Sequence, residues 1–304
     1  MSLRRLLWAA KWTVKAITPP ILVLALKWLL IGLRLRRRDT AAAAAPAPSE
    51  RPAAEPAEWE YIPEGWEHPE TGWDVETVAR AYRRKWPAYL AAIEPPRPLG
   101  VYYETAEVLE EDLGAHNMLV SFAYVLALSA RRRDRLSVLD WGGGLGHYYA
   151  LARSVVPDLE LDYHVKETPT VCAQGRDLLP AVAFHDDDRC LERRYDLVLA
   201  SSSLQYARDW RSLVTRLADA AQHRLFLARL PLVLRAEPFV VLQRAYQHGY
   251  ETEYLGWVFS RPSLLDAVRA AGLQLEREFL LGARFSAAGA PEDPVDHRSF
   301  LFTR

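Results

Sequence analysis

Cysteine is nearly absent from this chain of 304 residues, which contains only Cys172 and Cys190. Two cysteines cannot form the disulfide framework of a small secreted domain, and these two lack the spacing of a structural zinc site. We therefore expect the protein to work in a reducing compartment and to bind no metal. Half of the residues are hydrophobic, so the chain can bury a sizeable core without covalent support.

Acidic residues are missing from the first 38 residues, although the whole chain has a net charge of −1. This segment carries nine Lys and Arg side chains, which lie opposite apolar positions at helical spacing. Trp8, Trp12 and Trp28 are typical of helices anchored at a membrane interface. Residues 1–38 therefore predict basic amphipathic helices that bind an anionic membrane surface. We expect a cytoplasmic protein, peripherally associated with the inner membrane, with no nucleic-acid partner.

A long hydrophobic run is also missing. The most apolar stretch, residues 21–33, is interrupted by Lys27. As a helix it would span roughly 20 Å, which is less than the hydrocarbon core of roughly 30 Å. We predict helices that lie in the membrane plane, and a single transmembrane helix is the alternative. A cleaved signal peptide is disfavoured, because four arginines lie between residues 34 and 38.

The middle of the chain changes composition twice. Residues 39–58 contain mainly Ala, Pro and Glu and predict a disordered linker. Residues 59–135 are predicted to form an aromatic, Pro-rich strap (residues 59–73) followed by a helical cap. This cap includes a helix over residues 74–86, with Asp74 as its N-cap. Residues 136–304 are predicted to form the main domain.

Glycine is scarce as well, and four of the 15 glycines fall within residues 142–146. The sequence before them predicts a short strand that ends at Asp140, and a helix pattern follows them. Glycines in such a loop leave backbone N–H groups accessible to a ligand, and the helix start favours a negatively charged group. The dinucleotide-binding spacing Gly-x-Gly-x-x-Gly is absent, because Leu145 and His147 occupy positions where it needs glycine.

From residue 136 onward, apolar strands alternate with amphipathic helices, which predicts a mostly parallel sheet covered on both faces. Helices are predicted over residues 105–132, 210–221 and 262–271, the last after a Ser260 cap. The predicted strands are residues 137–140, 160–166, 181–184, 197–200, 225–228, 274–281 and 299–302. The last two predict an antiparallel hairpin.

Residues 95–304 resemble class I methyltransferases, in particular a family encoded with bacterial surface-polysaccharide genes. The resemblance lies in the spacing Asp140-x-Gly142-x-Gly144-x-Gly146 and in three further segments, residues 201–206, 229–231 and 239–243. It implies an α/β, Rossmann-like class I methyltransferase fold. Such a fold has a mostly parallel seven-stranded sheet with a terminal antiparallel hairpin, here with an N-terminal helical extension. The implied cofactor is S-adenosylmethionine.

The resemblance also implies where the cofactor would bind. Ligands of open α/β sheets bind beyond the carboxyl ends of the strands. Glu167 follows the second strand and would accept hydrogen bonds from the ribose hydroxyls. Asp186 or Asp187 follows the third strand and would contact the adenine amino group. The predicted cofactor-binding residues are Asp140, Gly142, Gly143, Gly144, Gly146, Glu167, Asp186, Asp187 and Ser201.

The acceptor side is predicted less specifically. The catalytic candidates are Ser203, Gln205, Tyr206 and His147. Further acceptor-side candidates are Arg229, Gln243, His248, Tyr250, Glu253, Tyr254 and Trp257. The aromatic segment 249–257 suits a sugar or polyol, and a packed surface loop is its alternative. We predict methyl transfer to a small-molecule or glycan acceptor, such as a lipid-linked precursor at the cytoplasmic membrane face. The alternative is a non-catalytic scaffold module in a membrane-associated assembly.

Overall fold

The structure is a computed structural model that describes residues 56–94, 99 and 112–304. Residues from Pro56 to Arg304 form one unit. The predicted membrane helices of residues 1–38 and the linker up to residue 55 lie outside the described residues. The same holds for the first part of the helical region predicted from residue 105.

The described chain contains these elements. The helices are α3 (Glu76–Ile93), α4 (Leu113–Ala130), α5 (His147–Val155), α6 (Pro169–Leu178), α7 (Trp210–Ala220) and α8 (Arg261–Ala270). The strands are β1 (Trp59–Tyr61), β2 (Arg135–Trp141), β3 (Glu160–Lys166), β4 (Ala183–His185), β5 (Tyr195–Ser201), β6 (Ala221–Val233), β7 (Phe239–Arg244), β8 (Glu253–Ser260), β9 (Gln274–Phe285) and β10 (Val295–Thr303). The short 3-10 helices are η1 (Gly65–Glu67), η2 (Asp188–Glu192), η3 (Leu204–Tyr206) and η4 (Tyr246–His248).

Seven of these strands form the predicted sheet. Strands β4, β3, β2, β5 and β6 lie side by side in this order and are all parallel. Strand β10 pairs antiparallel with β6, and β9 pairs antiparallel with β10. The parallel sheet and its terminal antiparallel hairpin confirm the predicted fold class.

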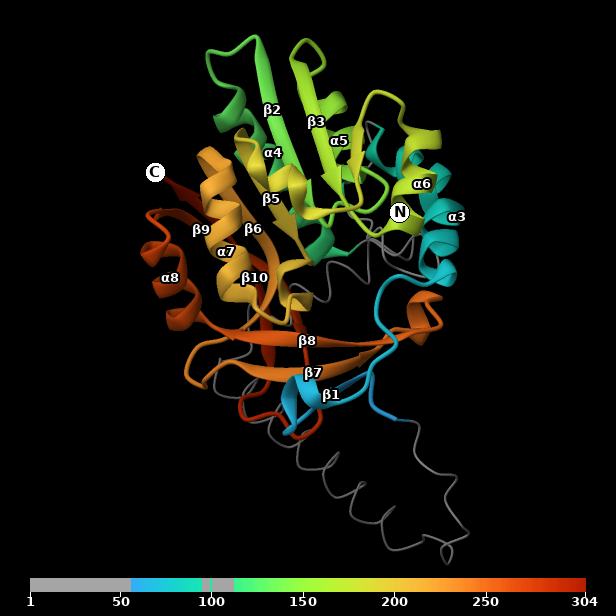
Figure 1. Ribbon diagram of the computed structural model, residues 1–304, viewed down its shortest axis with the longest axis vertical. Coiled ribbons are helices and arrows are strands. Elements are labelled where there is room, and N and C mark those ends of the chain that lie inside the picture. The colour runs from blue at the N-terminus through green and yellow to red at the C-terminus, as the bar shows by residue number, and fades with distance from the viewer. Residues whose placement is uncertain (1–55, 95–98, 100–111) are drawn as a thin grey trace, which may run out of the picture. The chain divides into compact units, whose positions relative to one another are not determined.

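Three additional strands, β1, β7 and β8, were not predicted. Strand β7 pairs antiparallel with β8 along its whole length, and β1 adds to the other side of β7. Strand β6 extends past Pro231, and its last residues, Leu232 and Val233, pair with β8. Figure 1 shows β8, β7 and β1 crossing below the end of the parallel strands. These strands therefore form a second layer facing the edge where ligands are expected.

Helices cover both faces of the parallel sheet, as Figure 1 shows. On one face, α7 and α8 pack through residues such as Val214 and Leu264 into a core with β5 and β6. On the other face, α4 and α5 pack through Phe122 and Leu151 onto β2 and β5. Helix α4 is long and apolar enough to cross a membrane, but half of that stretch is buried within the described unit. The two-sided burial explains the near-continuous apolar runs of the central strands.

Several predicted boundaries differ from the structure. Helix α3 covers Glu76–Ile93 instead of residues 74–86, and its N-cap is Val75 rather than the predicted Asp74. The predicted linker ends too late, because Arg244 donates from its backbone N to the Glu58 carbonyl at 2.8 Å and from Nη1 to the Ala57 carbonyl at 2.9 Å. Residues 57 and 58 thus belong to the folded unit.

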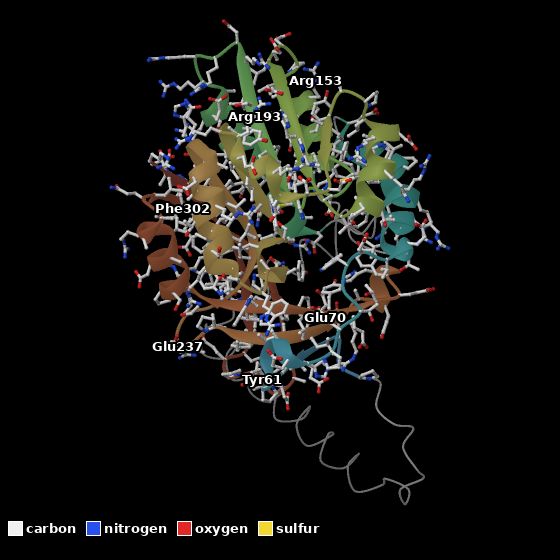
Figure 2. The ribbon with its side chains drawn as sticks, viewed as in Figure 1. Tyr61, Glu70, Arg153, Arg193, Glu237 and Phe302 are labelled. Carbon is white, nitrogen blue, oxygen red and sulfur yellow. The ribbon has the colours of Figure 1, made fainter. Side chains whose placement is uncertain are left out.

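The strap after β1 packs against the second layer. Figure 2 shows Tyr61 and Glu70 near this layer, far from Arg153 at the opposite end. Glu70 Oε2 accepts a hydrogen bond from the Leu255 backbone N at 2.6 Å, and Thr252 Oγ1 donates to the Gly72 carbonyl at 2.6 Å. The strap therefore brings the neighbouring Trp73 to the carboxyl edge of the parallel sheet.

Candidate active site

The loop between β2 and α5 needs its glycines for backbone conformation and for space. Gly142, Gly144 and Gly146 have positive φ angles of 76°, 56° and 85°, a region that favours glycine. A Cβ atom on Gly143 would lie 2.5 Å from Asp140 Cγ, and one on Gly142 would lie 2.3 Å from Ser203 Cβ. The loop backbone therefore lies directly against the ends of β2 and β5.

Asp140 lies beneath this loop and does not line the cavity described below. It is fully buried, and its Oδ2 accepts a hydrogen bond from Tyr163 Oη at 3.1 Å. Burial raises the pKa of Asp140 to about 8; the Tyr163 hydrogen bond opposes this rise, and the charge of Glu167 adds to it. Asp140, predicted to bind the cofactor, therefore supports the glycine loop from below.

Glu167 follows β3 and lines the cavity, as predicted. Its Oε2 accepts from the Thr168 backbone N at 2.6 Å, and its Oε1 accepts from the Gly144 backbone N at 3.4 Å. Burial raises its pKa, while these backbone hydrogen bonds and Lys166 act in the opposite direction. The carboxylate thus connects the glycine loop to the start of α6.

Asp186 and Asp187, predicted to contact the cofactor, do not line the cavity. Asp186 lies 3.5 Å from Arg176 at the surface. Asp187 caps η2 by accepting from the Arg189 backbone N at 3.0 Å, and the Arg189 side chain lowers its pKa. In the turn after β4, these acids form a helix cap and surface ion pairs.

The end of β5 and the loop after it contribute three serines to the cavity. Ser201 Oγ lies 2.8 Å from Tyr148 Oη, and Ser203 Oγ donates to the Trp141 carbonyl at 2.7 Å. Ser202 has a φ of 50°, which is uncommon for a residue with a side chain. Backbone strain of this kind clusters at functional sites, where the surrounding structure maintains it.

Aromatic side chains form one wall of the cavity. The rings of Trp73 and Tyr254 stack at 4.0 Å, and Tyr206 meets Tyr254 edge-on at 5.1 Å. Tyr206 Oη also donates to Gln243 Oε1 at 3.3 Å. Trp73 comes from the strap, whereas the other three residues come from η3, β7 and β8. The strap, η3 and the second layer therefore build this wall together.

Three histidines line the cavity, in different surroundings. The His147 ring opens α5 and packs against Tyr148 at 4.4 Å, so this predicted candidate is largely enclosed. His248 lies in η4, between β7 and β8, and its Nε2 lies 3.2 Å from Glu58 Oε1. His297 lies on β10. Glu58 and His297 were not predicted, because only the folded chain brings the strap and β10 to the cavity.

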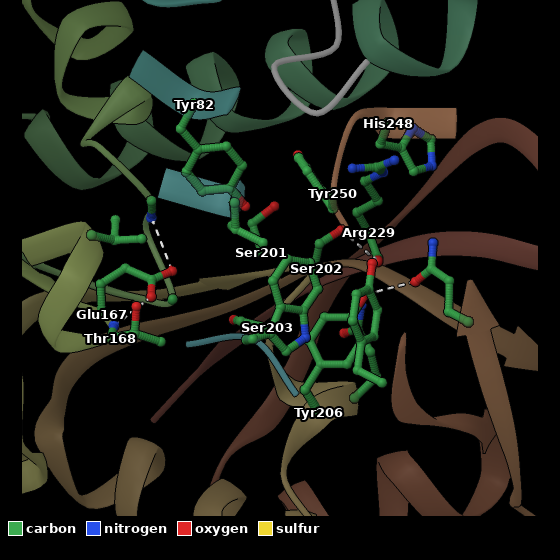
Figure 3. A pocket seen from close by; sticks show the side chains of 18 of the residues that line it. Tyr82, Glu167, Thr168, Ser201, Ser202, Ser203, Tyr206, Arg229, His248 and Tyr250 are labelled. Carbon is green, nitrogen blue, oxygen red and sulfur yellow. Dashed lines mark hydrogen bonds between the residues drawn. The ribbon is translucent and has the colours of Figure 1, made fainter. Parts of the chain in front are cut away.

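Together these groups enclose a cavity of about 620 Å³ at the carboxyl edge of the sheet. Figure 3 shows Glu167 and Thr168 at one end and Arg229, His248 and Tyr250 at the other. The predicted residues that line the cavity are Gly142, Gly144, His147, Glu167, Ser201, Ser203, Gln205, Tyr206, Arg229, Gln243, His248, Tyr250 and Tyr254. Gly143, Gly146, Glu253 and Trp257 do not line it.

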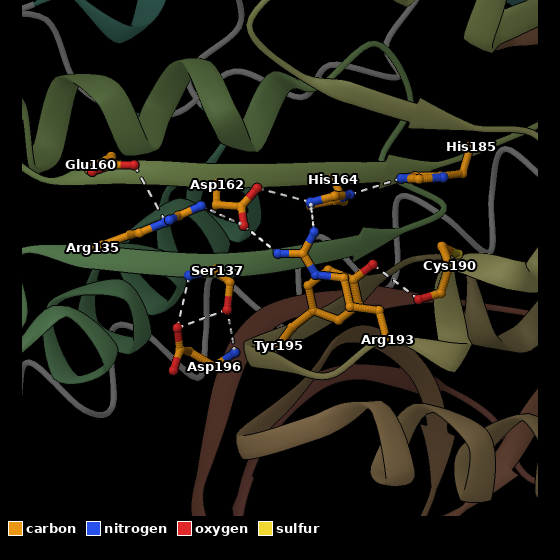
Figure 4. Close-up of polar contacts among 10 residues, drawn as sticks. All are labelled: Arg135, Ser137, Glu160, Asp162, His164, His185, Cys190, Arg193, Tyr195 and Asp196. Atoms are coloured by element: carbon orange, nitrogen blue, oxygen red, sulfur yellow. Dashed lines mark hydrogen bonds and ion pairs between the residues drawn. The ribbon is translucent and has the colours of Figure 1, made fainter.

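A second polar cluster lies outside the cavity, across β3, β4 and β5 (Figure 4). His164 Nδ1 lies 2.9 Å from His185 Nε2, and His164 Nε2 lies 3.0 Å from Asp162 Oδ1. Arg193 pairs with the same aspartate. Burial lowers the pKa of both histidines. His185 is therefore part of a structural network. Among the described residues, no group of three or more His, Cys, Asp or Glu side chains could hold a metal ion.

The end of the cavity that contains Glu167 fits S-adenosylmethionine. Gly142 and Gly144 present bare backbone at the start of α5, where a carboxylate is favoured. The Glu167 carboxylate is placed to accept hydrogen bonds from ribose hydroxyls. The buried Thr168 Oγ1 beside it has no hydrogen-bond partner among the described residues, as expected if a ligand supplies one.

The strand order and the glycine loop define a class I methyltransferase fold. A family model described as "Methyltransferase domain" matches residues 115–278, more than half of the chain. The chain belongs to this methyltransferase family. S-adenosylmethionine is the cofactor that this fold and these residues accommodate. No curated protein sequence matches the chain.

The solved structures to which this chain is similar are distant in sequence. Magnesium protoporphyrin IX methyltransferase (ChlM) from Synechocystis PCC 6803, with bound SAM, has 14% identity and a TM-score of 0.42, covering 77% of this chain and 99% of that one. CalS10, an amino pentose methyltransferase from Micromonospora echinaspora, has 19% identity and a TM-score of 0.40, covering 62% and 91%. The 1,6-didemethyltoxoflavin-N1-methyltransferase of Burkholderia thailandensis has 14% identity and a TM-score of 0.42, covering 62% and 78%.

Proposed function

We propose that this methyltransferase acts on a glycan or a lipid-linked precursor at the cytoplasmic face of the inner membrane. The observation that carries the proposal is the continuous cavity, in which cofactor-binding groups and an aromatic, polar wall line the same space. Methyl transfer is an in-line displacement, so donor and acceptor must be held together in a site that excludes water.

The cofactor supplies the electrophilic methyl group on its sulfonium sulfur, and the protein mainly binds and orients the reactants. Glu167 and the backbone of Gly142 and Gly144 hold the cofactor at one end. Ser201 and Ser203 lie on the loop between the two ends and are fixed by hydrogen bonds to Tyr148 and the Trp141 carbonyl. These contacts position the loop rather than supply a base.

The acceptor end has the composition that a sugar needs. Trp73, Tyr206 and Tyr254 line this end with packed aromatic rings, which suits the C–H face of a sugar. Gln205 and Gln243 add amide groups that can donate to and accept from hydroxyls. One relative with this fold is described as an amino pentose methyltransferase, which agrees with a carbohydrate acceptor.

The membrane part of the proposal is supported by the sequence of residues 1–38. Nine cationic and no acidic side chains in this segment would attract anionic lipids, by about 1 kcal/mol for each cation near the surface. Three tryptophans would add interfacial anchors. An anchored enzyme would meet lipid-linked acceptors at the membrane surface.

Cofactor binding is tested by titrating the full-length protein with S-adenosylhomocysteine in a calorimeter. We expect binding, and Glu167→Gln should weaken it by about 1.5 kcal/mol or more, because a charged hydrogen bond is lost. Glu160→Gln on the exposed side of the same strand is the control and should bind like the wild type. Absence of binding to the wild-type protein would refute the enzyme assignment.

The acceptor and the membrane site are tested separately. Glycolipid profiling of a deletion strain should show species lighter by one methyl group, whereas cofactor binding with no methylated product would favour the scaffold alternative. The full-length protein should sediment with phosphatidylglycerol vesicles and not with phosphatidylcholine vesicles. A protein lacking residues 1–38 that still sediments would contradict the membrane role of this segment.

A further inference from the structure

Gln205 lies in η3, directly after the serine-containing loop, and is packed between the cofactor end and the second layer. On one side, the close approach of Ser203 to Gly142 connects the start of this turn to the glycine loop. On the other side, a Cβ atom on Gly256 of β8 would lie 3.4 Å from Tyr206 Cε1 and 3.9 Å from Gln205 Cγ. This packing fixes Gln205 near the loop that holds the cofactor.

The amide of Gln205 is buried in the wall of the cavity, and its oxygen lacks a partner. Gln205 is 4% exposed and lines the cavity, and its Oε1 accepts no hydrogen bond from the described residues. Gln243 also lines the cavity but differs, because its Oε1 accepts from Tyr206 Oη at 3.3 Å. A buried acceptor without a partner is costly, so a group bound in the cavity is expected to donate to it.

The indole of Trp73 provides a complementary group close to the same turn. Its ring centroid lies 4.9 Å from that of Tyr206, the residue after Gln205. Trp73 lines the cavity, and its buried Nε1 has no hydrogen-bond partner among the described residues. Nε1 can only donate, whereas the amide Oε1 can only accept. An ionised carboxylate cannot donate to Oε1, and an ammonium cannot accept from Nε1, but a hydroxyl can do both.

We infer that Gln205 binds a hydroxyl group of the methyl acceptor, with the hydroxyl donating to Oε1, and that Trp73 Nε1 donates to an oxygen of the same molecule. This inference rests on the proposed function and deepens it, because it assigns the residue that selects a hydroxylated acceptor. Since η3 packs against the glycine loop, the bound hydroxyl lies toward the cofactor end. Gln205 thereby orients the acceptor toward the methyl donor.

Variants of Gln205 are assayed as full-length proteins with S-adenosylmethionine labelled in the methyl group and an extract of the cells that encode the protein. Gln205→Met keeps the length of the side chain and removes its hydrogen-bonding groups. It should lower the initial rate of labelling at least about tenfold in dilute extract and less in concentrated extract, because the acceptor binds more weakly. Gln205→Glu should recover part of this rate, since a carboxylate oxygen also accepts from a hydroxyl. The matched control Gln222→Met changes an exposed glutamine of β6 and should label like the wild type.

Two further measurements separate acceptor binding from a structural role. Without ligand, Gln205→Met should unfold at a urea concentration no lower than that of the wild type, because an apolar side chain replaces a buried oxygen that lacks a partner. Its affinity for S-adenosylhomocysteine should stay within about twofold of the wild-type value, which also shows that the variant is folded.

Acetylation of the extract tests the chemical class of the acceptor. Acetic anhydride modifies amines in water, whereas in pyridine it modifies hydroxyls as well. We expect wild-type labelling to survive the aqueous treatment and to disappear after the treatment in pyridine. Full labelling of the pyridine-treated extract, or loss of labelling after the aqueous treatment alone, would overturn the inference.

Three results with the variants would also overturn it while leaving the proposed function intact. The first is wild-type labelling by a folded Gln205→Met variant in dilute extract. The second is unfolding of this variant at lower urea than the wild type, which would show a structural role. The third is a loss of affinity for S-adenosylhomocysteine as large as the loss of rate, which would assign Gln205 to the cofactor. Failure of the wild-type protein to bind S-adenosylhomocysteine would instead refute the proposed function, so the two failures are distinguishable.

Discussion

The two ends of the cavity are constructed in different ways. The cofactor end is built from one short stretch of chain, between Asp140 and Glu167, and mainly from backbone and buried carboxylates. The acceptor end combines side chains from Glu58 to His297, which only tertiary packing brings together. The first end is therefore constrained by local conformation, whereas the second can change its side chains without disturbing the loop that holds the cofactor.

The largest expected effect tests how far the cofactor end depends on a buried carboxyl. Burial raises the folded-state pKa of Asp140 from 3.8 to about 8, so the unfolded chain loses this proton at lower pH than the folded protein. The contribution of Asp140 to the free energy of unfolding is thus fully present below about pH 4 and decreases until about pH 8. Relative to wild type, Asp140→Asn should gain several kcal/mol in free energy of unfolding between about pH 5 and about pH 9.

Urea unfolding at several pH values measures this difference in the ligand-free protein. The exposed Asp158, in the turn before β3, provides the control: the curve of Asp158→Asn should follow that of the wild type. A constant difference between Asp140→Asn and wild type over this pH range would show that Asp140 is already ionised beneath the loop.

The next prediction distinguishes two reasons for glycine at the cofactor end: the close contact with Ser203 and the positive φ angle. Gly142→Ala would place a Cβ 2.3 Å from Ser203 Cβ and would also force alanine to adopt a φ of 76°. Affinity for S-adenosylhomocysteine should fall about 100-fold, or about 2.7 kcal/mol, because the loop must shift. Isothermal titration calorimetry measures this loss.

Gly272→Ala is the matched control for Gly142→Ala. Gly272 has a similar φ of 84°, and its Cβ would meet nothing within 4 Å. This variant should lose about 1 kcal/mol of unfolding free energy and keep its affinity for S-adenosylhomocysteine. Equal losses of affinity in both variants would mean that the close contact with Ser203 is irrelevant.

The contrast between local signals and tertiary contacts also explains which strands the sequence predicts. The seven strands of the main sheet are short apolar runs, each bounded by a loop or a helix pattern, so local signals locate them. Strand β7 is a similar run, but no periodicity indicates its partner, and β1 has only three residues. Pairing between β1, β7 and β8 depends on contacts between residues far apart in the chain. These strands were therefore missed.

The sequence also predicts the residues of the cofactor end better than those of the acceptor end. Glycines and a carboxylate at fixed spacing predict Gly142, Gly144 and Glu167, since the backbone itself performs their role. The sequence does not decide between Asp186 and Asp187 as the residue that contacts the adenine, because only the folded turn shows that Asp187 caps η2. Trp73 had no local signal as a cavity residue, since its position depends on how the strap packs on β8.

The smallest expected effect tests whether the acceptor end can change alone. Tyr206→Phe removes the hydroxyl that donates to Gln243 Oε1 and leaves the ring packed against Tyr254. The initial rate of labelled methyl transfer at limiting acceptor, which reports kcat/KM, should fall by about 0.5–1.5 kcal/mol, or about 2–12-fold. Affinity for S-adenosylhomocysteine should not change. Tyr195→Phe removes a comparable hydrogen bond, to the Cys190 carbonyl, outside the cavity, and should leave the rate unchanged. If Tyr206→Phe weakened cofactor binding as much as it slowed transfer, the acceptor end could not change without disturbing the cofactor end.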